Sequence, residues 1–345
     1  MTAATRVLVA MSGGVDSSVA AALLVEAGHE VVGATLKLWG GDSDSGCCSV
    51  ADVDDARSVA RRLGIDHHVF NFGDDFDQHV VAPYVSAHAA GRTPNPCIEC
   101  NRHLKFDRLL RRADALGFDA VATGHHARIV ERPDGTRRVR RGADPSKDQS
   151  YVVHVLDAAG LARVSFPVGH LSKSEVRAEA TRLGLATADK PDSQDVCFIT
   201  ATGGRSAFLA DRITTRPGRV IDAAGATVGF VPEVELVTIG QRRGLGLVGG
   251  SEVAYVIKVD GPAATVTVGD AAALLVDQVV LEELRWVGEA EAGELLAQTS
   301  AHGTPQRCRV VGTTVMFTNP VRRVAPGQSV VLYANDEVVA GGIVA

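Results

Sequence analysis

Small and polar residues gather directly after the first apolar run of the chain, where they could hold a phosphate. The run Arg6-Val-Leu-Val-Ala-Met11 leads straight into Ser12-Gly-Gly-Val-Asp-Ser-Ser18. Gly13 and Gly14 allow positive φ and a close backbone approach to an anion, and the start of a helix offers unpaired N–H groups. The segment has neither the lysine of a Walker-type loop nor the G-x-G-x-x-G spacing. It predicts a nucleotide-phosphate loop of another class, with a strand-turn-helix corner capped by serine as the alternative.

A C-x-x-C motif is the second group of residues that could do chemistry. Cys97 and Cys100 follow two closely spaced prolines, which make the approach to the motif rigid. A thiol near a helix N-terminus has a lowered pKa and is therefore more often the nucleophilic thiolate. The alternative is half of a structural zinc site, which Cys197 and one of the adjacent pair Cys47 and Cys48 would complete.

Other polar segments are less specific. Cys197 stands between the acidic and polar residues Asp192-Ser-Gln-Asp195 and the apolar pair Phe198-Ile199, a setting more typical of a buried core cysteine than of a catalytic one. The loop 142–150 contains a compact Lys147-Asp-Gln149 set and reads as a solvated connection into a helix.

The composition of the chain excludes several classes of protein. The chain has 345 residues, of which 46% are hydrophobic, and a net charge of -6, so it can bury a large core and is not a generally basic nucleic-acid coat. Local arginine clusters still permit a basic face. Six cysteines are too few for a disulfide scaffold. No apolar run approaches a membrane span and the first six residues do not resemble a signal peptide, so we expect a cytoplasmic protein without a membrane partner.

The elements that must position these residues alternate between strand and helix in the first half. Apolar strand patterns occur at 7–11, 31–38, 67–72 and 120–123. Helical patterns lie between them and end at Gly28, Gly64 and Gly117, where left-handed C-caps belong. This alternation predicts a doubly wound parallel sheet with helices on both faces. Because ligands bind at the carboxyl ends of such strands, we expect the Ser12–Ser18 loop and Thr123-Gly-His-His126 to face one crevice.

The pattern changes further along the chain. A hairpin is expected over 127–141, with Pro133-Asp-Gly135 as its turn, and a helix over 172–183, opened by a capping box of Ser172 and Glu175. Beta structure dominates from about Arg216, with weak helical stretches only near Ala271 and Glu289. A small β module over 216–270 and a C-terminal barrel with strands at 279–287, 307–311, 315–318, 329–333 and 337–344 are therefore predicted.

In their order along the chain, these segments resemble the bacterial tRNA-specific 2-thiouridylases, a family of the ATP pyrophosphatase superfamily. The resemblance spans nearly the whole chain and rests on nine segments. They are 10–17, 46–48, 91–96 with Cys100-Asn101, 122–125, 147–151, 166–169, Asp192-Ser193 with Cys197-Phe-Ile199, 240–246 and 326–328.

The family resemblance implies both an architecture and a reaction. It implies an adenine nucleotide alpha hydrolase-like catalytic domain over 1–205, a small central β-rich domain over 206–272 and a tRNA-binding β-barrel over 273–345. Family members replace oxygen by sulfur at C2 of the wobble uridine of tRNA. ATP first adenylates the base, with Mg²⁺ as the expected metal, and sulfur then arrives from a donor such as a cysteine desulfurase or a sulfur-relay protein.

The same resemblance assigns residues to this chemistry. Cys197 would carry a persulfide, and Cys100 would attack it to release sulfur, forming a Cys100 to Cys197 disulfide that an external reductant resets. The ATP-binding residues would be Ala10, Met11, Ser12, Gly13, Gly14, Val15, Asp16, Ser17, Leu36 and Gly124. The tRNA-contacting residues would be Asn95, Pro96, Cys97, His125, Lys147, Asp148, Gln149, Ser300, Ala301 and Gln328, with the segment from Asn95 to Cys97 on the flipped base.

The chain departs from the family pattern at two places. Many family members carry an acidic residue where this chain has Cys97, and a thiol titrates too high to inherit the acid-base role of a carboxylate. We therefore hypothesise that Cys97, Cys100 and Cys197 form a three-thiolate iron-sulfur site with one open iron; the rival is a persulfide relay with Cys97 as a spare. In the barrel, Ser300 and Ala301 stand where a basic residue is common.

The sequence leaves two functions other than thiolation open. An ATP-dependent amidating synthetase would share the phosphate loop but has no use for Cys100 and Cys197. A non-enzymatic RNA-binding module would fit the barrel and the arginine clusters but not the ATP loop.

Overall fold

The computed structural model describes residues 5–38, 49–192, 196, 198–199, 204–247 and 253–345. The chain divides into two compact units. The first contains residues 1–81, 96–202 and 336–338, and the second contains 82–95, 203–335 and 339–345. Within the described ranges, no helix has the length and apolar character needed to cross a bilayer.

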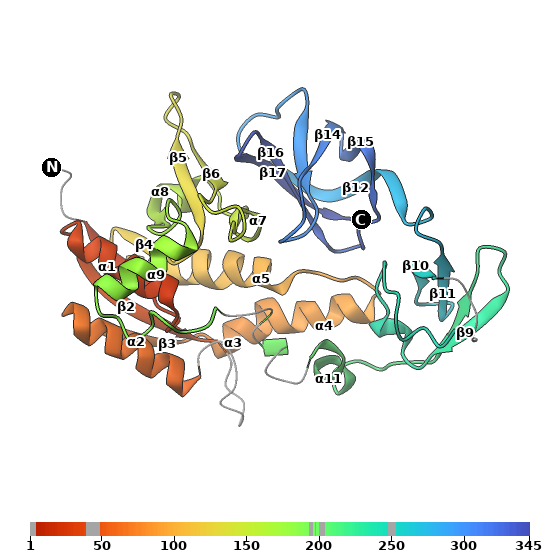
Figure 1. Ribbon diagram of the computed structural model, residues 1–345, viewed down its shortest axis with the longest axis horizontal. Helices are drawn as coiled ribbons and strands as arrows, with labels where there is room; N and C mark the ends of the chain where they lie inside the picture. Colours follow the sequence, from red (N-terminus) through yellow and green to blue (C-terminus); the bar gives the residue numbers. More distant parts are fainter. Residues whose placement is uncertain (1–4, 39–48, 193–195, 197, 200–203, 248–252) are drawn as a thin grey trace. The chain divides into compact units, whose positions relative to one another are not determined.

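A five-stranded parallel sheet forms the centre of the first unit (Figure 1). Its strands are β1 (Arg6–Ala10), β2 (Glu30–Lys37), β3 (His67–Asn71), β4 (Ala120–Thr123) and β7 (Val164–Ser165), in the order β3-β2-β1-β4-β7. Ala10 at the end of β1 lies opposite Ala34 and Thr123. The loops after β1 and β4 therefore leave the same edge of the sheet, as the sequence predicted.

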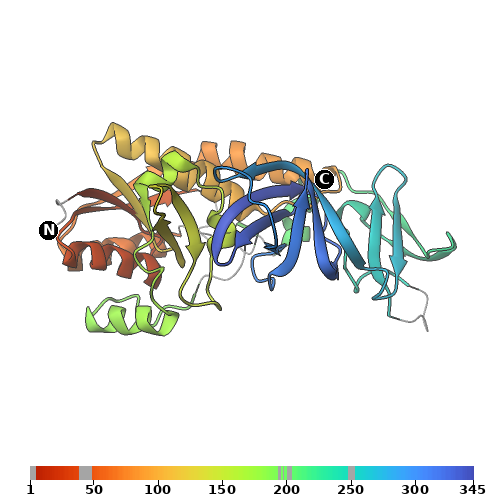
Figure 2. The same cartoon turned by 90° about the horizontal axis from the view of Figure 1, so that it is seen from above.

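Helices cover both faces of this sheet, which confirms the doubly wound α/β fold. The helices α1 (Val15–Glu26), α2 (Val50–Leu63) and α9 (Lys173–Arg182) pack their apolar residues against one face in a single cluster. The helix α6 (Leu109–Ala115) contacts β4 on the other side, and Figure 2 shows the strands between α1 and α6. The capping box at Ser172 and Glu175 is present as predicted.

The helical region between β3 and β4 is longer than the sequence indicated. It comprises α3 (Gly73–Phe76), η1 (Asp77–Val81), α4 (Ala82–Ala89), α5 (Pro96–Glu99), η2 (Cys100–Arg108) and α6. The helical segment that was expected to end at Gly117 begins at Pro96, because proline is well suited to a first helical position. The segment η2 is a π-helix, a form often found at functional sites.

The predicted hairpin and its neighbours complete the first unit. Strands β5 (Ala127–Glu131) and β6 (Arg137–Arg141) pair antiparallel around a turn in which Gly135 has φ of 78°. Two short helices follow, α7 (Ser150–Val153) and α8 (Ala158–Arg163).

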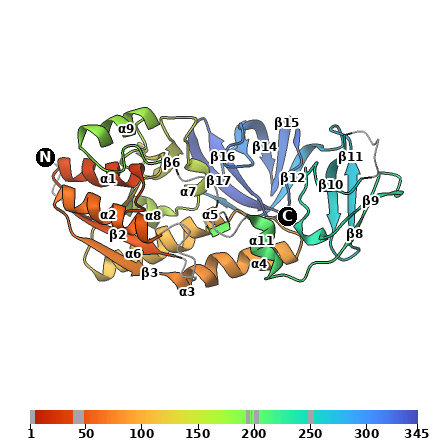
Figure 3. The same cartoon turned by 60° about the horizontal axis from the view of Figure 1, so that its bottom comes forward.

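The central part of the second unit is a small β module, as expected. It contains α11 (Arg205–Ala210), β8 (Gly218–Ile221), β9 (Thr227–Val231), η3 (Val234–Leu236), β10 (Tyr255–Asp260) and β11 (Thr265–Gly269). The strands run in the order β10-β11-β8-β9 (Figure 3). Valine and leucine side chains from these elements form one buried cluster.

Six strands form the C-terminal barrel. They are β12 (Leu275–Trp286), β13 (Leu295–Gln298), β14 (Gln306–Val311), β15 (Thr314–Arg322), β16 (Ser329–Ala334) and β17 (Glu337–Val344). They run in the order β12-β15-β14-β13-β16-β17, and pairing of β12 with β17 closes the barrel. The sequence missed β13, which is only four residues long. The weak helical stretches expected near Ala271 and Glu289 are wrong, because turns and bends occupy both places.

Candidate active site

The loop between β1 and α1 has the conformation of an anion cradle. Gly13 adopts φ of 72°, and a Cβ there would lie 2.3 Å from the backbone oxygen of Asp52. Gly14 occupies the N-cap position of α1 and supplies no side-chain cap, so the first N–H groups of this helix are left for a ligand. The hydroxyl of Ser18 donates to the Gly14 carbonyl at 2.8 Å. Ser18 thus stabilises the shape of the loop, whereas the side chain of Ser12 is exposed.

Neighbouring strands position this loop closely. The backbone N–H of Met11 donates to the Ala34 carbonyl at 2.8 Å, and the hydroxyl of Thr35 donates to the Met11 carbonyl at 2.8 Å. A Cβ on Gly124, directly after β4, would lie 2.5 Å from the backbone nitrogen of Ser17. The two loops therefore adjoin one another, and only glycine permits this approach. Leu36 is buried near the same edge of the sheet.

A lysine from a distant part of the chain reaches into the loop. The Nζ of Lys173, the first residue of α9, lies 2.7 and 2.8 Å from the two carboxylate oxygens of Asp16. It also lies 2.9 Å from Oδ1 of Asp192. Lys147 and Arg177 contact Asp192 as well, at 2.7 and 2.8 Å. Three cations thus surround two carboxylates at the phosphate loop.

These contacts set the ionisation of both carboxyl groups. Burial would raise the pKa of Asp16, but hydrogen bonds from His126 and Lys173 outweigh it and hold the pKa below its ordinary value. Burial would also raise the pKa of Asp192, but the contacts with Lys147 and Lys173 outweigh burial and hold this pKa well below its usual range. Both groups are carboxylates at neutral pH and can exchange partners with a bound polyphosphate or cation.

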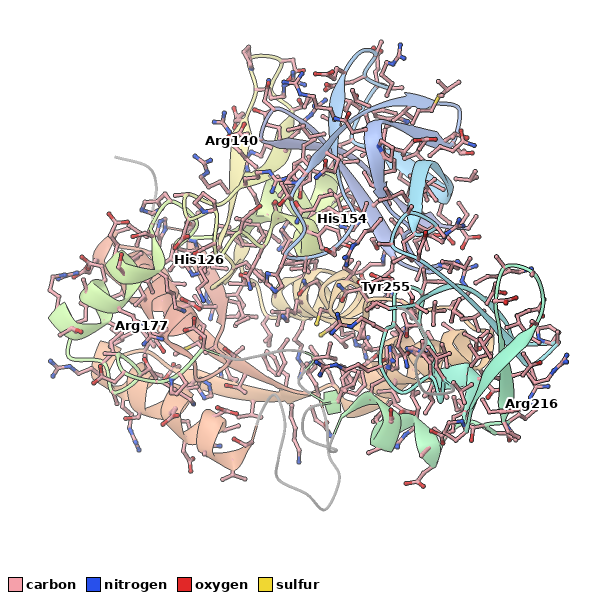
Figure 4. The ribbon with its side chains drawn as sticks, turned by 45° about the vertical axis from the view of Figure 1, so that its right-hand side comes forward. His126, Arg140, His154, Arg177, Arg216 and Tyr255 are labelled. Atoms are coloured by element: carbon pink, nitrogen blue, oxygen red, sulfur yellow. The ribbon has the colours of Figure 1, made fainter. Side chains whose placement is uncertain are left out.

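His126 is a second partner of the Asp16 carboxylate. Its Nε2 lies 3.0 Å from Oδ1 of Asp16, and its backbone N–H donates to Oε1 of Gln149 at 2.8 Å. The ring is buried, and its Nδ1 has no hydrogen-bond partner among the described residues. Figure 4 shows His126 and Arg177 within this part of the first unit.

The two thiols of the C-x-x-C motif differ in exposure. Cys97 is half-buried in α5, whereas Cys100 is buried at the start of η2. Asn101 fixes this turn, because its Nδ2 donates to the Val152 carbonyl at 2.9 Å. Cys197, Cys47 and Cys48 lie outside the described residues. Phe198, the neighbour of Cys197, is 2% exposed and packs edge-to-face on Phe76, with ring centroids 5.5 Å apart.

The predicted tRNA-contacting residues of the first unit have structural partners. His125 is buried, contacts Phe106 and Phe166, and hydrogen-bonds Thr123 at 2.6 Å; burial lowers its pKa far below the ordinary value. Asp148 accepts from the backbone N–H of Gly142 and of Ser150. Their contacts with tRNA stay predictions, as does that of Pro96, which is buried at the start of α5.

In the second unit, Gln328 and the segment before Asn95 come together. The Nε2 of Gln328 donates to the Thr93 carbonyl, and the Thr93 N–H donates to the Pro326 carbonyl at 2.8 Å. Ser300 and Ala301 lie in a turn whose two carbonyls accept from the side-chain amide of Gln298. Roles for these residues in tRNA binding stay predictions.

Sequence reasoning expected the segment 123–126 to face the phosphate loop, but it missed Lys173, the contact of His126 with Asp16 and the ion pairs of Asp192. No motif marks Lys173, since it stands 157 residues from Asp16. The position of Lys173 in its helix could have indicated its role. Lys173 directly follows the N-cap Ser172, and a helix N-terminus in this fold points toward the ligand edge of the sheet.

The described residues offer few ligands for a metal ion. Within the described part of the chain, no three His, Cys, Asp or Glu side chains gather to hold a metal ion. Cys97 and Cys100 are only two of the three thiols needed for the hypothesised cluster. For Mg²⁺, which takes one or two carboxylates together with substrate phosphates, Asp16 is suitably placed at the phosphate loop.

A parallel sheet with a phosphate loop at its carboxyl edge defines an α/β nucleotide-binding domain. Residues 5–201 match the family model of the tRNA methyl transferase HUP domain, 206–270 that of the tRNA methyl transferase PRC-barrel domain and 276–344 that of the aminomethyltransferase beta-barrel domain. The domain boundaries predicted from the sequence stay predictions.

Relatives that align over nearly all of this chain identify the family to which it belongs. A tRNA-specific 2-thiouridylase of Streptomyces coelicolor is 46% identical over 99% of this chain and 94% of its own length. A tRNA-specific 2-thiouridylase of Chloroflexus aurantiacus is 44% identical over 99% of this chain and 98% of its own length. The chain belongs to the tRNA-specific 2-thiouridylase family and is a tRNA-uridine 2-sulfurtransferase.

A remote likeness is found to a solved structure. A 4-thiouridine synthetase in complex with RNA and ATP is 19% identical, with a TM-score of 0.39 over 59% of this chain and 47% of that one. That likeness is too distant to bear on the chemistry of this chain.

Proposed function

We propose that this enzyme adenylates the C2 oxygen of the wobble uridine of tRNA and then replaces that oxygen by sulfur. One observation carries the proposal: the uncapped N-terminus of α1, with Lys173 bound at Asp16, forms a cationic phosphate site. The buried thiol of Cys100 belongs to the same compact unit. Phosphate binding and sulfur chemistry are thereby combined in one domain.

In the first step, the residues at the loop bind and orient ATP. The C2 oxygen attacks the α-phosphorus, the bond from that phosphorus to the bridging oxygen breaks, pyrophosphate leaves and the base loses its N3 proton. The free N–H groups of α1 and the ammonium of Lys173 stabilise the charge that builds up on the phosphates. Mg²⁺, when bound at Asp16, would neutralise further phosphate charge.

In the second step, sulfur displaces AMP. The outer sulfur of a Cys197 persulfide attacks C2, and the bond from C2 to the adenylated oxygen breaks. The Cys100 thiolate then attacks the inner sulfur, so that the S–S bond of the persulfide breaks and the outer sulfur stays on the base. The resulting Cys100 to Cys197 disulfide needs two electrons from a dithiol reductant of a reducing cytoplasm. A cysteine desulfurase or sulfur-relay protein reloads Cys197.

The departure at Cys97 gives the alternative for sulfur delivery. In that alternative, Cys97, Cys100 and Cys197 hold an iron-sulfur cluster, which would supply an open iron for sulfide. Anaerobic purification followed by visible absorption and iron analysis separates the two routes. A colourless, iron-free and fully active enzyme would eliminate the cluster.

The proposed function is tested by separating the two half-reactions. The full chain is incubated with unmodified tRNA, ATP and a sulfur donor, and AMP and the thionucleoside are measured by mass spectrometry. We expect Cys100→Ser and Cys197→Ser to form no 2-thiouridine. Cys308→Ala, in the barrel, is the matched control and retains full activity. If both serine variants keep full turnover, the thiol mechanism is wrong.

A further inference from the structure

The central β module contains a cavity of about 540 Å³ that the reaction described above does not use. Residues from α11, from η3 and from the loop after η3 line it. This loop includes the segment 240–244, which belongs to one of the motifs that carry the family resemblance. Every lining residue belongs to the second compact unit.

Arginines give this cavity its charge. Arg205 and Arg243 line it, with Glu233 as the one acidic lining residue among the described residues. The guanidinium of Arg205 donates to the Thr238 hydroxyl at 2.8 Å and to the Leu236 carbonyl at 3.0 Å. Both acceptors are neutral, so these bonds fix the guanidinium in place without cancelling its charge.

The charge of Arg205 also acts on its surroundings. Burial lowers the pKa of His88 to about 4, and the nearby positive charge of Arg205 adds to the effect. The imidazole is therefore neutral at pH 7 and adds no cation of its own. In the described part of the chain, Arg243 makes no ion pair and is exposed at the cavity.

The loop that presents Arg243 is held in one shape. Gly240 and Gly244 have φ of 82° and 71°, values that side chains disfavour. Between them, the side chain of Gln241 accepts from the Thr238 N–H at 3.1 Å and donates to the Arg243 carbonyl at 2.8 Å. A rigid loop loses little conformational freedom when it binds a ligand.

We propose that this cavity binds a backbone phosphate of the tRNA substrate, with Arg243 and Arg205 as the ligands. The chain has a net charge of -6, so attraction to RNA must come from local cationic sites such as this one. Guanidinium groups bind phosphate oxygens in a planar, two-pronged geometry. The inference rests on the proposed function, since the RNA is the substrate of that reaction.

The test measures binding of unmodified tRNA to the full chain, without ATP, over a range of KCl concentrations. For Arg243→Gln we expect binding weakened about 3- to 10-fold and a salt slope reduced by about 0.7 to 0.9, the value of one lost phosphate contact. In turnover, the KM for tRNA rises while kcat stays within twofold. Arg219→Gln, an exposed arginine of β8 outside the cavity lining, is the matched control and leaves binding unchanged.

Each other outcome overturns the inference. Equal affinity and an equal salt slope for Arg243→Gln and the unaltered chain exclude a phosphate contact there. If inorganic phosphate binds the unaltered chain but not Arg243→Gln, at constant ionic strength, while both bind tRNA equally well, the cavity takes a free anion instead of the RNA backbone. A failure of the proposed function is distinguishable, because it would show as tRNA binding without 2-thiouridine in the unaltered enzyme.

Discussion

Replacing Lys173 by glutamine tests the cation of the phosphate loop directly. Glutamine keeps much of the side-chain length but removes the ammonium that contacts Asp16 at 2.7 and 2.8 Å and Asp192 at 2.9 Å. The side chain is only 12% exposed, so water cannot fully replace the lost charge. We expect activation of the base by ATP to slow while sulfur transfer itself is untouched.

The size of the effect follows from the contacts. A hydrogen bond to a charged group contributes about 1.5 to 3 kcal/mol, and each 1.36 kcal/mol changes a rate tenfold. Lys173→Gln should therefore reduce the rate of AMP formation roughly 10- to 160-fold. The free energy of unfolding should fall by only about 1 to 2 kcal/mol, because Asp16 keeps its contact with His126 and Asp192 keeps Lys147.

The assay is single-turnover formation of AMP from radiolabelled ATP, with enzyme in excess and tRNA saturating. Arg182→Gln is the matched control. Arg182 lies on the same helix and also contacts two carboxylates, but these are Glu26 and Glu179 at the far end of α1 and α9. We expect the control to react at the unaltered rate. A Lys173→Gln enzyme that forms AMP within twofold of that rate, at unchanged KM for ATP, would refute the role of Lys173.

Three further predictions concern packing and titration. Gly124→Ala places a Cβ 2.5 Å from the Ser17 nitrogen; we expect a loss of about 1 to 3 kcal/mol in thermal or urea unfolding and weaker ATP binding, and an unchanged ATP affinity would contradict the close approach. Burial raises the pKa of Cys308 to about 11, so iodoacetamide at pH 8 should leave this thiol unlabelled in folded protein, as read by peptide mass spectrometry; rapid labelling would show the site to be open. Asp192 has a depressed pKa when folded, so its stabilisation is present above the unfolded pKa of about 3.9 and is lost as pH falls below it. Asp192→Asn should therefore unfold about 1 kcal/mol more easily at pH 7, and the difference should shrink below pH 4; a constant difference would be inconsistent with linkage.

Local patterns were enough to predict four of the five strands of the sheet and the phosphate loop, but they missed the two-residue strand β7. The strand 120–123 was predicted with its observed bounds, and glycines at 28, 64 and 117 end helices with φ of 82°, 69° and 72°. These features depend on residues close together in sequence, where alternation and capping act. The strand over 295–298 was missed, and the π-helical turn at Cys100 has no periodic signature.

The sequence by itself determined that a loop of serines and glycines follows a buried strand, that two cysteines precede a helix and that a β-barrel ends the chain. Only the tertiary structure decided which cation serves the loop, because Lys173 reaches Asp16 across 157 residues. It also decided that His125 is buried between aromatic rings and that Arg205 keeps an uncancelled charge. Charge pairing and burial depend on distances in space, and no spacing along the chain encodes them.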